Sequence, residues 1–385
     1  MHITSATAYH LKAPLETPYR TTFGVMTHRQ AVIVILTGSD DVTGIGETYI
    51  NFPTWAPFER LATYREALFG RIAGVEIEDI PAFMGGLWRS YMRAAMQGGC
   101  LGPLMQALSA VSCALWDLRA KREGVPLRAL FSDSPAAKVK VYGSGINPPF
   151  PGEAIRDGLD MGMDVMKLKL GFGTEQDREN IRALKLIVGN SASVAVDVNR
   201  SWSFEETCGW LDWLADNGIA WLEEPLDMAD QHRYPELLER SPVPVSAGEN
   251  FLIPPGTDFT VEGRDCLSFN GSALAPDIIQ PAVVKNCCFG DAVRFTAHVE
   301  GMGKKVFPHF LGSAPGMATS ANLAALTADP HLEWDINPNP LRTSFFTGPL
   351  RAVDGMLTLP DAPGIGWDLD MEALERWTVS RVAVP

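Results

Sequence analysis

Three acidic side chains recur at one spacing in the second half of the chain. Asp197 ends the apolar run SVAVD, Glu223 ends IAWLE, and Glu249 follows VPVSAG. Asp197 and Glu223 are 26 residues apart, and so are Glu223 and Glu249, which is the length of one strand–helix unit. Consecutive parallel strands would bring these carboxylates to one edge, the carboxyl-terminal rim where barrel active sites lie.

Converging carboxylates repel one another and raise each other's pKa unless a cation lies among them. Oxygen-only ligands suit a hard divalent ion, Mg²⁺ first and Mn²⁺ second. We therefore expect Asp197, Glu223 and Glu249 to bind Mg²⁺, with positions left for water or substrate oxygens. The alternative is three solvated acids at strand ends, which explains one such residue better than three at equal spacing.

Two lysines, Lys167 and Lys169, stand two residues apart in VMKLKLG, so one face of a strand carries both. The strand is predicted to be central, which makes water harder to reach. A lysine beside another cation and a metal is expected to have a lowered pKa and to serve as a general base. The alternative is a solvated pair on an edge strand.

Two further polar residues close later apolar runs. His309 ends VFPH and Glu333 ends HLE, on the predicted seventh and eighth strands. A lone histidine is often a satisfied core residue. We favour a site role for His309 because it is expected at the same rim as the carboxylates.

Eight short apolar runs alternate with amphipathic segments between residues 139 and 333. They are VKVYGSG, VMKLKLG, SVAVDVN, IAWLEEP, VPVSAGEN, DIIQP, KVFPHF and HLEWDI. Eight strands with seven helical segments between them favour a closed parallel α/β barrel over an open doubly wound sheet. No GxGxxG or Walker loop follows an early strand, which also argues against the open sheet.

Helix signals lie between the runs. Ser203 and Glu206 form a capping box, and a helix ending at Gly189 is predicted from apolar residues on one face. Those residues are Ile181, Leu184, Ile187 and Val188. Earlier in the chain, AVIVILTG reads as an alternating strand, and a long helix stops at Gly124. That helix carries Leu108, Val111, Leu115 and Leu118 at helical spacing.

Composition describes a globular protein with a large core. The 385 residues are 46% hydrophobic and 20% charged, with a formal net charge of −14, which argues against nucleic-acid and anionic-membrane partners. The start of the chain does not resemble a secretory signal, and no apolar stretch is long enough to span a bilayer. The six scattered cysteines indicate a reducing compartment, the adjacent Cys287 and Cys288 indicate packing, and we expect the cytoplasm.

The ordered set KLK, DVN, WLEEP, SAGEN, DIIQP, VFPHF and LEWDI resembles the enolase superfamily, in its mandelate racemase/muconate lactonizing enzyme family. GIGE and ALWDL near the amino terminus are similar to that family's capping domain. The resemblance implies an α/β fold with a (β/α)7β TIM-like barrel. It makes residues 1–130 an α+β capping domain, residues 131–340 the barrel and residues 341–385 a segment returning to the capping domain.

The resemblance also implies roles for individual residues. It makes Asp197, Glu223 and Glu249 the Mg²⁺ ligands of a mandelate racemase-like subgroup. It makes Lys169 the base, Lys167 its neighbour on the substrate carboxylate, and His309 an acid or base on the opposite face. The substrate-binding residues would be Asn199, Glu333 (donating to the substrate carboxylate if protonated) and Arg20 in a loop over the barrel mouth. A small carboxylate substrate and a homo-oligomer are expected.

One position departs from the family pattern. The subgroup reads QPD after the sixth strand, and that aspartate orients the histidine, whereas this chain reads Gln280–Pro281–Ala282. Asp277 stands at the strand start and is not placed to substitute. A histidine without a carboxylate partner is a weaker base. We therefore expect a lyase that dehydrates a hydroxylated sugar acid. Alternatives are a racemase, epimerase or lactone cycloisomerase and, in another class, a non-catalytic metal-binding barrel.

Overall fold

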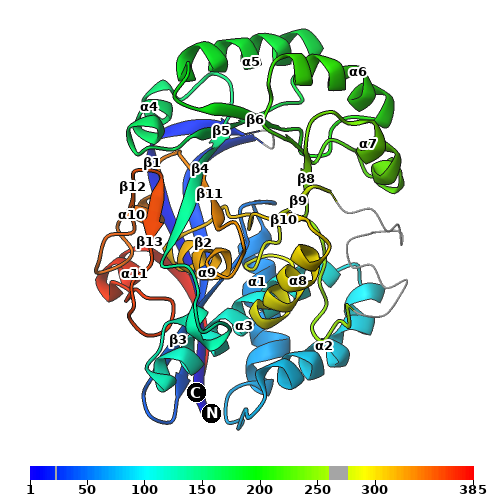
Figure 1. Cartoon of the computed structure of the whole chain (residues 1–385). Coiled ribbons are helices and arrows are strands. Elements are labelled where there is room, and N and C mark those ends of the chain that lie inside the picture. The colour runs from blue at the N-terminus through cyan, green and yellow to red at the C-terminus, as the bar shows by residue number, and fades with distance from the viewer. Residues whose placement is uncertain (22–23, 260–275) are drawn as a thin grey trace.

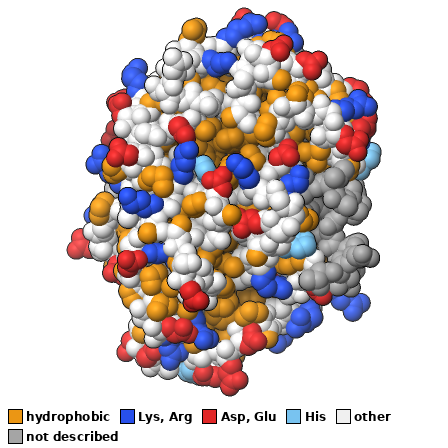
Figure 2. Space-filling model, in the orientation of Figure 1, with side chains coloured by type: hydrophobic (Ala, Val, Ile, Leu, Met, Phe, Trp, Pro, Cys, Tyr) orange, Lys and Arg blue, Asp and Glu red, His pale blue; other side chains and the backbone are white. Residues whose placement is uncertain are grey.

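A computed structural model describes residues 1–21, 24–259 and 276–385, except for the side chains of residues 19 and 20. Figure 1 shows a ring of strands with helices outside it, beside a second unit built from the start and end of the chain. The two termini lie next to each other in that second unit. In the same orientation, Figure 2 shows acidic and basic side chains scattered over the visible face, with hydrophobic side chains between them.

The ring consists of eight strands in parallel order. Each of β4 to β9 pairs with the next strand along the chain, and β11 returns to pair with β4. All eight predicted strands are present: β4 (Lys138–Ile146), β5 (Val165–Lys169), β6 (Ser193–Asp197), β7 (Leu222–Glu223), β8 (Val245–Ala247), β9 (Ile278–Ile279), β10 (Lys305–Val306) and β11 (His331–Asp335).

Helices cover the outside of the ring in six of the connections that the structure describes. They are α4 (Gly152–Asp160), α5 (Thr174–Val188), α6 (Phe204–Asp216), α7 (Tyr234–Arg240), α8 (Phe289–Gly301) and α9 (Ala314–Ala324). Much of the connection from β8 to β9 lies in residues 260–275, so the seventh predicted helical segment falls outside the described residues. The barrel prediction is confirmed.

Local signals explain where these helices start and which face they bury. Ser203 accepts from the Glu206 amide and Glu206 accepts from the Ser203 amide, so the predicted capping box at α6 is confirmed. In α5 the other predicted apolar residues are buried, but Ile187 is 42% exposed. Its predicted burial is wrong because at 100° per residue it lies well away from the face that Ile181 and Leu184 share.

The second unit is the capping domain. Its sheet has the order β14–β1–β2–β3; the helices α1 and α3 pack against the sheet, and α2 packs against α3. Its elements are β1 (Ile3–Thr21), β2 (Gly24–Gly38), β3 (Thr43–Thr48), α1 (Ala56–Thr63), α2 (Ile80–Gln97), α3 (Leu101–Glu123) and β14 (Thr378–Val384). Gly124 ends α3 with a φ of 69°, as predicted for its helix stop.

The apolar strand β2 faces two cores rather than one. Val32, Val34 and Leu36 pack with the capping-domain helices, whereas Ala31 and Ile33 belong to the cluster that continues into the barrel. The expected alternation of buried and exposed residues is therefore wrong here, because both faces of the sheet are covered.

The end of the chain returns to the capping domain through β14, which pairs antiparallel with β1. Before it come α10 (Pro340–Thr343), β12 (Ala352–Val353), β13 (Met356–Thr358) and α11 (Met371–Trp377). The β13 strand pairs with β4, so this segment touches both units. The exact domain boundaries stay a prediction.

Buried polar contacts fix the capping domain on the barrel. Glu47 of β3 accepts from the Ser313 amide at 2.8 Å, the Ser313 hydroxyl at 2.6 Å and the Gly316 amide at 2.8 Å, at the start of α9. Burial raises the pKa of Glu47, although these donors oppose the shift. Arg29 of β2 pairs with Asp335 of β11, and both side chains are buried.

We expect Glu47→Ala to lower the free energy of unfolding by about 3 kcal/mol, because three buried donors lose their acceptor. Denaturant unfolding followed by circular dichroism measures this. Glu66→Ala, on the 69% exposed side chain of Glu66 in the same domain, is the matched control and should leave the transition unchanged. Equal unfolding curves for the two variants would contradict the contact's importance.

Candidate active site

The inside of the barrel has an apolar floor beneath a charged level. Tyr142, Trp221 and Phe307 pack edge to face inside the ring, with ring centroids 5.2 and 6.2 Å apart. Two residues beyond Trp221, on the same side of β7, lies Glu223, and the Trp221 indole N–H donates to its Oε2 at 3.3 Å. The aromatic floor thus separates the charged level from the amino-terminal end of the barrel.

Lys167 lies fully buried at the centre of the charged level. Its Nζ is 2.5 Å from Glu223 Oε1, 2.7 Å from Glu333 Oε1 and 3.9 Å from Asp197 Oδ2. Burial alone would lower the pKa of Lys167, but the Glu223 and Glu333 carboxylates raise it well above its ordinary value. Lys167 is therefore a fixed cation here, and the alternative of a solvated lysine on an edge strand is wrong.

Lys169 lies one pleat nearer the rim and pairs directly with Asp197 Oδ2. We expected a lowered pKa for this lysine. Burial does act in that direction, but the Asp197 carboxylate overcomes it and raises the pKa. The expectation therefore fails for this arrangement, since Asp197 bonds to the lysine itself.

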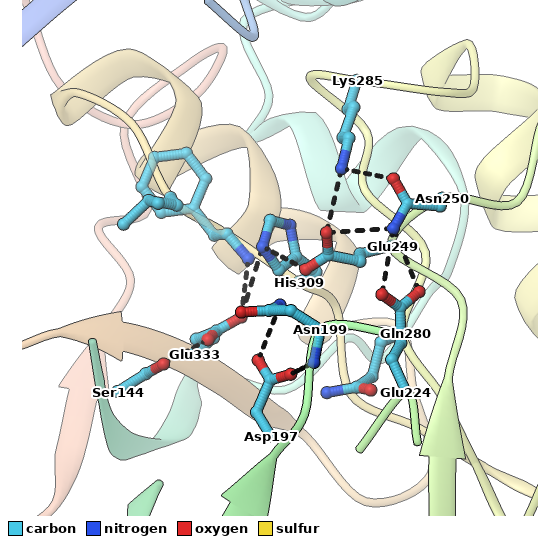
Figure 3. Close-up of polar contacts among 12 residues, drawn as sticks. Ser144, Asp197, Asn199, Glu224, Glu249, Asn250, Gln280, Lys285, His309 and Glu333 are labelled. Carbon is cyan, nitrogen blue, oxygen red and sulfur yellow. Dashed lines mark hydrogen bonds and ion pairs between the residues drawn. The ribbon is translucent and has the colours of Figure 1, made fainter. Parts of the chain in front are cut away.

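The third predicted ligand faces the histidine. Glu249 Oε2 is 3.1 Å from His309 Nε2, and Glu333 Oε2 is 3.7 Å from the same nitrogen. Figure 3 shows these groups converging from different strand ends. Burial lowers the pKa of His309, although both carboxylates oppose the shift. The structure thus brings His309 and Glu249 together, as the sequence predicted.

The other ring nitrogen of His309 is isolated. Among the residues that the structure describes, Nδ1 has no hydrogen-bond partner. The His309 amide donates to the Pro281 carbonyl at 3.1 Å, which places the next residue, buried Ala282, on the neighbouring segment. Asp277 accepts from the Val245 amide at 3.0 Å, at the start of β8, so it lies far along the strand direction from the rim.

Glu333 lies deeper than expected, in the middle of β11 rather than at its end. Its Oε1 accepts from the Ser144 hydroxyl and pairs with Lys167. Burial would raise the pKa of Glu333, but Lys167, His309 and Lys169 lower it to about 2. In this arrangement the Glu333 carboxylate is ionised and can only accept hydrogen bonds. The expectation that Glu333 donates a hydrogen bond to a substrate carboxylate is therefore not met.

Asn199 holds a predicted ligand. Its amide N–H donates to Asp197 Oδ1 at 2.8 Å and its Nδ2 to Asp197 Oδ2 at 3.3 Å, from a backbone with φ of 49°. It thus fixes the carboxylate of Asp197. The side chain of Arg20 lies outside the described residues.

Four polar residues in the site were missed by the sequence reasoning. Gln280 donates to Glu223 Oε2 at 2.6 Å, Lys285 contacts Glu249, and Asn250 donates to both oxygens of Glu224 at 3.0 and 3.1 Å. Burial raises the pKa of Glu224 to about 7. Three of them could have been found from their neighbours in the sequence. Glu224 and Asn250 directly follow predicted metal ligands, and Gln280 stands two residues before Ala282, where the chain differs from the family pattern.

The charge balance of the site suits a divalent cation. Glu224 has Arg200 as its partner at 3.6 Å. Four further acids, three of them buried and Glu249 13% exposed, are in contact with three lysines. They are Asp197, Glu223, Glu249 and Glu333, with Lys167, Lys169 and Lys285. With Lys169 protonated, one divalent ion would leave one positive charge on this set of residues. With Lys169 unprotonated, as a base must be, the same ion would make the set neutral.

The ligand side chains are not yet arranged around a common point. Within the described ranges, no three acidic, histidine or cysteine side chains form a ready metal-binding group. Lysine ammonium groups hold the carboxylate oxygens instead, and a metal would take their place. The donor chemistry, oxygen atoms from three neighbouring strand ends, fits Mg²⁺.

Comparison with known proteins decides the family. Residues 152–373 match the "Enolase C-terminal domain-like" family, and residues 3–131 match the "Mandelate racemase / muconate lactonizing enzyme, N-terminal domain". The chain belongs to the mandelate racemase/muconate lactonizing enzyme family of the enolase superfamily. The resemblance inferred from the ordered motifs is confirmed.

Relatives in this family extend over most of the chain. A D-galactarolactone cycloisomerase from Agrobacterium fabrum is 27% identical over 97% of this chain and 98% of its own length. A hydrophobic dipeptide epimerase from Roseobacter litoralis is 30% identical over 68% of this chain and 72% of its own. The crystal structure of a family member from Bordetella bronchiseptica RB50 is 29% identical, with a TM-score of 0.80 over 98% of this chain and 99% of that one.

The named relatives are dehydratases, cycloisomerases and epimerases, and the chain is accordingly an enzyme of the lyase or isomerase kind. Within the part of the chain that the structure describes, no helix has the length and apolar character of a membrane span.

We expect Mn²⁺, a spectroscopic substitute for Mg²⁺, to bind the wild-type chain. Asp197→Asn, Glu223→Gln and Glu249→Gln should each weaken binding at least about tenfold, since each removes a charged ligand. Titration followed by electron paramagnetic resonance measures the affinity. Glu175→Gln, on an 80% exposed side chain, is the control. Unchanged affinity in two of the three ligand variants would refute the assignment.

Proposed function

We propose that this enzyme removes the proton alpha to the carboxylate of a small hydroxylated acid and then expels a beta hydroxyl as water, leaving a keto acid. Mg²⁺ would be held by Asp197, Glu223 and Glu249. Bound there, it would supply electrostatic stabilisation of the charge that develops on the substrate carboxylate. The main support for elimination is the isolation of one ring nitrogen of His309. Its Nδ1 has no hydrogen-bond partner among the described residues.

The residues of this chain divide the proton transfers between them. Lys169, at the rim on β5, would take the alpha proton as the C–H bond breaks. It would do so in the unprotonated form, which becomes easier to reach once Asp197 binds the metal instead of the lysine and no longer raises its pKa. Lys167, a buried ammonium two residues away, attracts the substrate carboxylate. His309 donates a proton to the departing hydroxyl, so that the C–O bond breaks with release of water. When the alpha carbon carries a hydroxyl, the product of this elimination is an enol. The enol gains a proton at the beta carbon and loses its hydroxyl proton, which gives the keto acid.

Elimination suits the surroundings of His309 better than a second proton abstraction. A catalytic histidine base is ordinarily oriented through its other ring nitrogen by a carboxylate that stabilises the imidazolium. Here Ala282 occupies the neighbouring segment and offers no acceptor. A protonated His309 can still donate to a leaving group, whose growing charge provides the driving force.

An isomerase is the second candidate, and one observation favours it. The cycloisomerase relative aligns with nearly the whole of this chain, and the compound in its name is a lactone. A lactone ring can leave without a strong second base, so Ala282 does not count against it. The non-catalytic barrel is no longer a candidate, since the named relatives are enzymes and Lys167, Lys169 and the ligand acids are all present.

We expect Lys169→Ala to lower turnover by several orders of magnitude on any substrate found in an acid-sugar library, while Mn²⁺ affinity persists. The reason is loss of the base without loss of a ligand. Turnover is followed through keto-acid formation. Lys305→Ala, on a 60% exposed lysine, is the control. Near-normal turnover in Lys169→Ala would show that Lys169 is not the base, and Lys167 would then be the next residue to test.

The outcome of the reaction can be read in D₂O by NMR, with enzyme, Mg²⁺ and both alpha epimers of the substrate. We expect keto acid from one epimer only. Epimers that interconvert with alpha deuterium and without keto acid would show two working bases and make the enzyme an isomerase.

We expect Ala282→Asp to increase alpha exchange from the His309 face, because the new carboxylate can accept from Nδ1 and stabilise the imidazolium. The same deuterium experiment measures the exchange, with Ala282→Asn as the uncharged control. Equal exchange in wild type and Ala282→Asp would show that residue 282 does not act on the histidine.

A further inference from the structure

Lys285 is a buried cation that the proton transfers do not use. It lies in the turn after β9, with its side chain 8% exposed. Its Nζ is 3.0 Å from Glu249 Oε1 and 2.8 Å from Asn250 Oδ1, and it lies 4.8 Å from the centre of the Tyr49 ring. Figure 3 shows it reaching Glu249 and Asn250 from the far side of the site.

The Lys285 contact also fixes the direction of the Asn250 amide. Because Oδ1 accepts from Lys285, Nδ2 points the other way, where it donates to Glu249 Oε1 at 3.2 Å and to Glu224. Glu249 Oε1 therefore receives two donors. Its second oxygen, Oε2, faces His309 Nε2.

We infer that Lys285 and Asn250 restrict Glu249 to monodentate binding, through one carboxylate oxygen. This restriction would make the site bind Mg²⁺ in preference to Ca²⁺. The inference rests on the proposed metal site. Mg²⁺ requires a small octahedron, in which a carboxylate supplies one oxygen, whereas Ca²⁺ takes six to eight oxygens and often both of one carboxylate. With Oε1 occupied by two donors, Glu249 has only Oε2 to give.

The capping domain supports this arrangement. The Tyr49 amide donates to the Val284 carbonyl at 2.7 Å, directly before Lys285. The Tyr49 ring then lies against the ammonium group. Docking of residue 49 thus holds both the backbone and the side chain of the residue that restrains Glu249.

The test is the ratio of Mg²⁺ to Ca²⁺ affinity in Lys285→Met, measured for each ion by displacement of Mn²⁺. Both ions carry two charges, so removing the lysine charge shifts both affinities alike and cancels in the ratio. Removing one of the two donors to Oε1 opens a lone pair on this oxygen, through which Glu249 can bind Ca²⁺ with both oxygens although Asn250 still donates to it. We expect the ratio to fall about tenfold or more, in line with other changes next to a ligand.

Lys305→Met is the matched control and should keep the wild-type ratio, because Lys305 pairs with Asp329 outside the site. Asn250→Ala tests the second donor to Oε1 and should lower the ratio in the same direction, which keeps the inference testable if Lys285→Met does not fold. Affinities that change together, with the ratio unchanged in both variants, would overturn this inference alone. A wild-type chain that binds neither ion would instead refute the proposed metal site.

Discussion

Four carboxylates share the inside of one barrel, and their mutual repulsion must be offset for the barrel to fold. Three buried acids, Asp197, Glu223 and Glu333, lie around three lysines together with Glu249, which is 13% exposed. Burial of an unpaired carboxylate is strongly unfavourable, so each one must have a cation or a hydrogen-bond donor. The donors from Ser144, Asn199, Asn250 and Gln280 meet this need and leave the excess charge that a divalent ion would balance.

The surrounding elements keep this cluster away from water. Below it, Tyr142, Trp221 and Phe307 fill the barrel with aromatic rings. Above it, the capping domain is fixed on the barrel by buried contacts from Glu47 and Arg29. Charge interactions are stronger when water is excluded, so the same packing that stabilises the fold also increases the electrostatic effect of the site on a bound carboxylate.

Much of this architecture could be predicted from the sequence because its signals are local. Apolar runs of strand length, a capping box at Ser203 and a glycine stop at Gly124 each report on a few neighbouring residues. The spacing of 26 residues worked because one strand–helix unit repeats, which brought Asp197 and Glu223 to paired positions in adjacent strands. These local signals predict the structure correctly because the tertiary contacts favour the same helices and strands.

The remainder depended on contacts between distant segments. The pKa of Lys169 follows from its pairing with Asp197, 28 residues away, and no pattern near the lysine reports it. Lys285 has no recognisable motif, and its role emerges only where the turn after β9 meets the segment after β8. Ile187 was misplaced because one apolar residue beside a helical stripe looks like a member of it.

We propose that the carboxylates of Asp197, Glu223 and Glu249, at the carboxyl ends of β6, β7 and β8, form one divalent metal site. The most direct measurement is anomalous X-ray diffraction from crystals of the wild-type chain soaked in Mn²⁺. We expect a single strong peak in the barrel mouth, bound by Asp197, Glu223 and Glu249, with Lys169 no longer on Asp197. A barrel mouth without a peak, or a peak bound without two of these three residues, would contradict it.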